Sequence, residues 1–174
     1  MKHLISAIVF SLLVVGEVLA GNLNTAQLVK LANAKSISTV SSIANSNGYK
    51  LAYKHNGARG WEGYDMTDMA WSYNASYVAS SNGWSYSGSF SAIKLLYNNS
   101  QNSSESIVYV VSDGKYFNQI KTQISSYGYT FYKEDTNIFP NSIAYCFFND
   151  SLGIYAIFQE SFGNGGYQIH FYHE

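Results

Sequence analysis

A short pattern that occurs twice constrains the fold of this 174-residue chain more than any other feature. The first copy spans residues 37–51 and the second spans 117–131. Apolar residues recur at intervals of three and four at the start of each copy, which predicts an amphipathic helix. Gly48 or Gly128 then stands where the backbone turns left-handed after a helix. Apolar and polar residues alternate afterwards, so each copy predicts a helix, a glycine cap and a returning strand.

The rest of the chain is predicted to be mostly strand, because short runs of alternating residues are separated by turn residues. The two helices are expected at 37–47 and 115–126. Asn24 and Gln27 have the spacing of a capping box, which predicts a further helix at 25–33. The strands are expected at 49–54, 69–73, 90–97 and 107–111, and then at 129–133, 142–148, 153–159 and 166–172.

The predicted fold class is α+β, with two tandem duplicated helix-plus-antiparallel-sheet units. Each unit is a helix followed by about four strands, at about 36–112 and 113–174, with the helices packed on one sheet face. Residues 145–148 and 154–158 are apolar on both faces of their strands. The second face is therefore expected to be open and lined by Tyr and Phe, or covered by the other unit, a ligand or a second copy in a homodimer.

Residues 1–20 have the features of a cleaved signal peptide. Lys2 gives a basic start, residues 4–15 are apolar, and cleavage is expected between Ala20 and Gly21. A membrane-spanning helix needs roughly 20 apolar residues, so an uncleaved anchor is the weaker alternative and no span is expected after cleavage. Residues 21–174 are therefore expected to form one exported domain, periplasmic or extracellular, with a bacterial envelope favoured.

The chain is unusually aromatic and weakly charged. Phe, Trp and Tyr make up 17% of it, and only 12% is charged, against about a quarter in typical proteins. The net charge is −1 and no run of Lys and Arg occurs, which argues against nucleic acid as a partner. Cys146 is the only cysteine, so no intramolecular disulfide can form, and its apolar neighbours predict a small buried hydrophobic residue.

No motif of a zinc site, a nucleophile elbow or a phosphate loop occurs. Glu62, Asp65 and Asp68 lie three residues apart and could converge on a calcium ion or act as paired acids on a sugar, but a solvated acidic loop is the simpler interpretation. His170 and His173 face opposite sides of a predicted strand, which disfavours a shared metal. We therefore expect no metal, no cofactor and no enzymatic activity.

The duplicated helix-plus-sheet pattern resembles the β-lactamase inhibitory proteins in predicted architecture. The resemblance covers most of residues 21–174, and it implies a concave sheet presented to an enzyme partner. The paired cysteines of that family and its Gly-Met-Thr helix start are absent from this sequence. The resemblance therefore carries over no residue.

Three functions compete on these observations. The first is an exported non-enzymatic protein-binding module, such as an inhibitor or immunity protein, which uses an open sheet face and the loop at 55–65. The second is a carbohydrate-binding module of the cell envelope, and the third is an enzyme of unknown type centred on Glu62 and Asp68. Aromatic side chains serve protein and sugar recognition alike. The expected binding residues are Trp61, Tyr64, Trp71, Tyr73 and Trp84.

Overall fold

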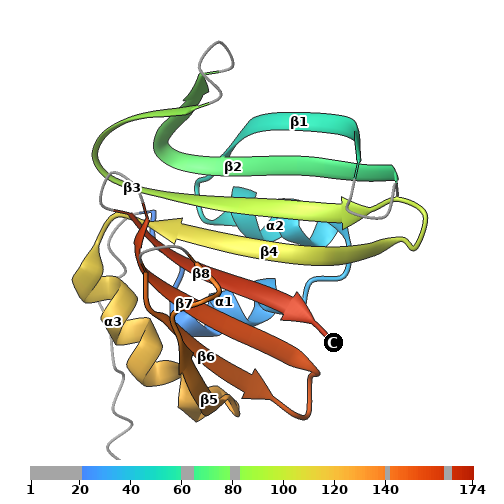
Figure 1. Ribbon diagram of the computed structural model, residues 1–174. Coiled ribbons are helices and arrows are strands. Elements are labelled where there is room, and N and C mark those ends of the chain that lie inside the picture. Colours follow the sequence, from blue (N-terminus) through green and yellow to red (C-terminus); the bar gives the residue numbers. More distant parts are fainter. Residues whose placement is uncertain (1–20, 60–64, 79–82, 140–141, 163–165) are drawn as a thin grey trace, which may run out of the picture.

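A computed structural model describes residues 21–59, 65–78, 83–139, 142–162 and 166–174. The strands of that part form one antiparallel sheet in the order β1-β2-β3-β4-β8-β7-β6-β5 (Figure 1). The elements, in chain order, are α1 (Thr25–Ala32), α2 (Ile37–Ser46), β1 (Lys50–Arg59), β2 (Asp65–Val78), β3 (Gly83–Asn98), β4 (Ser103–Val111), α3 (Gly114–Gln123), the 3₁₀ turn η2 (Ile124–Tyr127), β5 (Thr130–Asp135), β6 (Ala144–Asn149), β7 (Ile154–Phe162) and β8 (Gly166–His173).

The prediction of two tandem helix-plus-sheet units is wrong, because the two predicted ranges share one continuous sheet. Strand β4, from residues 36–112, pairs with β8, from residues 113–174, from Ser106↔Tyr172 to Val111↔Tyr167. Each of these strands would otherwise expose a row of unpaired N–H and C=O groups at a sheet edge. Periodicity predicts local elements and faces, but it does not say which strand pairs with which.

The caps of the helices follow the sequence signals. The Asn24 side chain accepts from the Gln27 N–H at 2.9 Å and the Gln27 side chain accepts from the Asn24 N–H at 2.8 Å, so the predicted capping box is confirmed. Gly48 and Gly128 follow α2 and η2 with φ of +80° and +85°, in the left-handed region predicted for both.

All three α-helices contribute to one hydrophobic core on one face of the sheet. Leu28 of α1, Val40 of α2 and Phe117 of α3 join a single cluster of buried side chains. Helices α1 and α2 lie behind the sheet in Figure 1, and no described helix lies on its opposite face. Within the described ranges no helix has the length and hydropathy of a membrane span.

The first described residues are anchored in this core. The Gly21 carbonyl accepts hydrogen bonds from the hydroxyls of Tyr49 and Ser91, and the Leu23 N–H donates to the Tyr109 hydroxyl at 3.1 Å. Gly21 has φ +91°, and a Cβ there would lie 2.1 Å from a ring carbon of Tyr73. Only glycine fits this position without a shift of its neighbours.

Candidate functional site

Strands β2 and β3 extend beyond the sheet as a bent two-stranded ribbon. The pairing of β2 with β1 ends at Lys50↔Ser72, and the register with β3 shifts between Tyr73 and Ala75. Asn74 occupies this irregular position with φ +55°. Because a bulge adds residues to one strand and bends it, the ribbon turns away from the sheet (Figure 1). We call residues 75–78 and 83–86 the arm.

The arm carries two aromatic side chains to the side of the sheet that no described helix covers. Tyr77 and Trp84 pack there on Tyr53 of β1, with ring centroids 4.6 Å and 6.1 Å from it. The ring of His55 stacks on Tyr53 at 4.9 Å. We call these four residues the arm cluster. The rings of Tyr77 and Trp84 meet at 68°, so the cluster is not a flat platform.

A carboxylate lies beside the arm cluster. The Tyr53 hydroxyl donates to Asp68 Oδ1 at 3.1 Å. Burial, and to a smaller degree the charge of Asp68, raise the pKa of the Tyr53 phenol, so this group stays protonated and keeps donating. Asp68 therefore acts here as an acceptor that holds Tyr53, which is one of the two partially buried tyrosines of the cluster.

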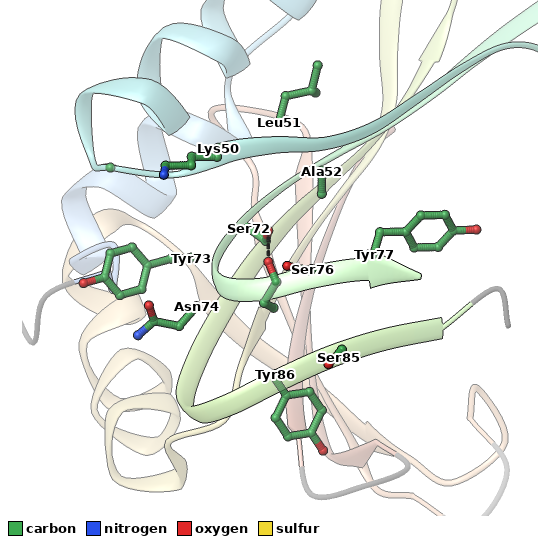
Figure 2. Close-up of a pocket in the computed structure, with 12 residues that line it drawn as sticks. Lys50, Leu51, Ala52, Ser72, Tyr73, Asn74, Ser76, Tyr77, Ser85 and Tyr86 are labelled. Carbon is green, nitrogen blue, oxygen red and sulfur yellow. Dashed lines mark hydrogen bonds between the residues drawn. The ribbon is translucent and has the colours of Figure 1, made fainter. Parts of the chain in front are cut away.

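A cavity of about 740 Å³ lies between the start of β1 and the bend of the arm (Figure 2). Small residues leave the space, and three of them, Ser72, Ser76 and Ser85, add hydroxyl groups to its lining. Tyr73, Asn74, Tyr77, Tyr86 and Lys50 also line it, and Figure 2 shows the rings of the three tyrosines pointing in different directions. We call this space the arm cavity. Its lining includes serines and tyrosines and one charged residue, Lys50.

The same sheet face also carries a mixed aromatic and aliphatic surface, with its aromatic side chains on β8, β7 and β6. Tyr172 of β8 is paired with Tyr155 of β7, which is paired with Phe148 of β6. Their sequence neighbours belong to the core on the helix side, so these side chains point the opposite way. The row continues with aliphatic side chains on the same face. We call the set the sheet-face patch, and its members are Leu96, Val108, Phe148, Tyr155, Ile157 and Tyr172.

A buried histidine lies within the patch, between Val108 of β4 and Ile157 of β7. His170 is 7% exposed, its Nε2 atom has no hydrogen-bond partner among the described residues, and its ring lies 4.8 Å from that of Phe139. Burial, and to a smaller degree the charge of Lys94, lower the pKa of His170 to about 4. Cys146 is buried on the same face, and burial raises the pKa of its thiol. Neither group has the exposure of a reactive centre.

The predicted binding residues divide into three groups. Trp61 and Tyr64 lie outside the described residues, as does Glu62. Trp71 is 2% exposed and belongs to the core, so its ring is not on the surface. Tyr73 lines the arm cavity and Trp84 belongs to the arm cluster. Of the five, the structure therefore places Trp84 on the arm and Tyr73 at its bend, against the core.

Several residues of the site had no separate signal in the sequence. His55 and Tyr77 lie close in sequence to the predicted binding residues but were not themselves predicted. Their contact depends on the bend at Asn74. Lys50 and the serines of the arm cavity resemble any polar surface residues. Over the described part of the chain, no group of three His, Cys, Asp or Glu side chains could hold a metal ion.

Comparison with known proteins leaves the geometry as the basis for a function. No protein-family model, curated protein or solved structure matches the chain. Two surfaces are then available for interpretation, the arm with its cavity and the sheet-face patch. Both lie on the part of the molecule that no described helix covers.

Proposed function

We propose that this chain is an exported, non-enzymatic binding protein that recognises another protein through the sheet-face patch, in the manner of an inhibitor or an immunity protein. The observation that supports this most is the patch itself. Aromatic and aliphatic side chains lie side by side there, and Tyr172 is still 36% exposed. Cores of protein interfaces have this composition, because Tyr and Phe bury a large area at little cost in side-chain entropy.

The way the patch is held also favours a protein partner. Phe148 and Tyr155 already pack on each other with ring centroids 4.4 Å apart. The side chains of the patch stand on five adjacent strands, β3, β4, β8, β7 and β6, whose other face is packed against the core. A surface that is already ordered loses little freedom on binding, so a larger part of the contact energy appears as affinity. The charged cross-strand neighbours of the patch are Asp68 beside Leu96 and Lys94 beside Val108, away from the aromatic side chains on β6, β7 and β8.

A charge placed in the patch tests this proposal. The variant Tyr155→Glu introduces a carboxylate at its centre, and the variant Ser42→Glu introduces the same charge on the exposed side of α2. Residues 21–174 of both variants and the wild type are immobilised and exposed to the envelope and secreted fractions of the producing cell. We expect one stoichiometric protein to be retained by the wild type and by Ser42→Glu but not by Tyr155→Glu.

The outcome that contradicts the proposal is a protein retained equally by all three chains, or none retained by any of them. Thermal unfolding followed by circular dichroism must show that Tyr155→Glu is still folded. If it is not, Tyr155→Ala is used, because truncation removes the ring without burying a charge.

The arm cavity favours a second candidate function, the binding of a carbohydrate. Its volume lies within the range of small-ligand sites, roughly 300–1,000 Å³. Serines and tyrosines are among the residues that line this cavity. Serine hydroxyls can form hydrogen bonds with a sugar, and tyrosine rings can stack on it. The two functions use different surfaces of the molecule and are tested separately.

A further inference from the structure

We infer that the arm cavity is a site for a saccharide that carries a carboxylate, and that Lys50 selects the charged sugar over its neutral counterpart. This inference rests on the carbohydrate-binding candidate and makes it specific. It starts from the hydroxyl groups of the wall. A hydroxyl donates and accepts at once, so the serines of the lining match a ligand that does the same at each carbon. A polyol meets this condition.

The rings beside the cavity suit a sugar ring. Tyr86 lines the cavity, is 41% exposed and is stacked on Phe90 with centroids 4.2 Å apart. This stacking holds the ring of Tyr86 in place. Both residues lie where the pairing of β3 with β2 is interrupted. A sugar brings an apolar C–H face as well as hydroxyl groups, and a fixed aromatic ring is a surface on which that face can lie.

The charge of the wall points to an anion. Lys50 is the single charged residue among the described residues that line the cavity, and no Asp or Glu belongs to that lining. Lys50 pairs with Ser72 across the β1–β2 ladder, so the two side chains leave the same face of the sheet beside the cavity. An ammonium group attracts a carboxylate as a point charge and with three donors. A neutral sugar would not form this ion pair with Lys50.

The cavity is formed before any ligand arrives. The Ser72 hydroxyl donates to the Ala75 carbonyl at 2.6 Å across the bulge, and the Asn74 amide donates to the Ser89 carbonyl at 3.3 Å. The first bond lies within β2 and the second joins β2 to β3, and both stabilise the bend of the arm. Since the bend creates the space, a ligand finds the site without ordering it first.

Two trisaccharides that differ only at C6 test the inference, trigalacturonate and α-1,4-galactotriose. Binding to residues 21–174 is measured by isothermal titration calorimetry at low ionic strength. We expect the wild type to bind trigalacturonate about fivefold more tightly than galactotriose, as for an ion pair at a partly exposed site. The variant Lys50→Met should reduce this preference to about one, and added salt should weaken the wild-type preference.

The matched control is Lys54→Met. Lys54 is an exposed lysine on the same strand that does not line the cavity, so its removal changes the net charge equally and should leave the preference unchanged. A second variant, Ser76→Phe, places a ring in the cavity and should abolish binding of both sugars. Thermal unfolding of each variant shows that the fold is kept.

The outcomes separate the two levels of the argument. If the wild type binds both trisaccharides equally, the carbohydrate function stands and the inference about charge and Lys50 falls. If Lys54→Met loses the preference as fully as Lys50→Met, the effect belongs to the overall charge and the inference also falls. If neither sugar binds at millimolar concentration, or Ser76→Phe leaves binding intact, the cavity is not a saccharide site and both ideas fall together.

Discussion

The two halves of the sheet have four strands each but offer different surfaces. In the half made by β1–β4, two strands are 14 and 16 residues long and run past their neighbours. In the half made by β5–β8, the strands have six to nine residues and stay within the sheet. The surplus length, with the irregularity where Asn74 lies opposite residues 87–90 of β3, bends out as the arm and leaves a cavity. Where the surplus is missing, the same face carries the aromatic part of the sheet-face patch.

The largest expected effect tests whether the halves fold as one unit. Phe158 lies in the core of the second half, with its ring 5.5 Å from Phe117 and 5.4 Å from Phe147. We expect Phe158→Ala to lower the free energy of unfolding by about 3–5 kcal/mol, the usual cost of removing a buried ring. All three tryptophans lie in residues 61–84, so their fluorescence reports on the first half. The fluorescence transition and the circular dichroism transition should shift together. A fluorescence midpoint that stays at its wild-type value would show that the halves unfold separately.

A pH series tests the buried histidine of the second half. The pKa of His170 is about 4 in the folded chain and is ordinarily about 6.5. As pH falls from about 6.5 towards 4, the unfolded chain takes up a proton that the folded chain does not. The folded state therefore loses stability over this range, by about 2–3 kcal/mol in total. The difference in unfolding free energy between wild type and His170→Gln should show this slope in denaturant titrations. Parallel curves for the two chains between pH 4 and 6.5 would contradict it.

Two glycines, one in each half, sharpen the comparison at the level of single atoms. Gly21 and Gly153 both have positive φ, but a Cβ would meet Tyr73 at Gly21 and nothing within 4 Å at Gly153. Gly21→Ala should cost about 2–4 kcal/mol from backbone strain and overpacking, and Gly153→Ala about 1 kcal/mol from strain alone. Chemical denaturation measures both. Equal costs would mean that the contact with Tyr73 relaxes freely.

The smallest expected effect concerns the bulge that separates the two surfaces. Asn74 has φ +55°, which asparagine tolerates better than alanine does. Asn74→Ala should lower the free energy of unfolding by about 1 kcal/mol, and Asn74→Gly should change it by less than about 0.5 kcal/mol. Amide hydrogen exchange in residues 75–78 should rise in the alanine variant while that of β6 and β7 stays unchanged. If exchange rises equally in β6 and β7, the bend is not a local feature of the first half.

Local structure was predictable because its signals lie within a few residues. The capping box at Asn24 and the glycine turns at Gly48 and Gly128 each depend on neighbours in the chain, and each is present in the structure. The pairing of β4 with β8 depends on residues about 65 positions apart, such as Ser106 and Tyr172. No local pattern encodes such a choice, which is why the single sheet was missed.

The candidate site was harder to predict because it depends on which face of a strand is covered. Met69, Trp71 and Tyr73 alternate as expected, but the alternation does not say whether their side faces helices or solvent. The helices lie on that side, so Trp71 is buried. The bulge at Asn74 then changes the phase of β2, and Tyr77 emerges on the other side beside Tyr53. Sequence periodicity does not locate a bulge of this kind.

The anchored start of the domain has a consequence for the order of events during synthesis. The partners of Gly21 and Leu23 are Ser91 and Tyr109, which lie 70 and 86 residues further along the chain. A chain that emerges with its N-terminus first exposes residues 21–23 until β3 and β4 have followed, because such distant contacts close late. The predicted cleavage between Ala20 and Gly21 is expected to fall within this interval. The interval ends when the hydroxyls of Tyr49 and Ser91 form their hydrogen bonds to the Gly21 carbonyl.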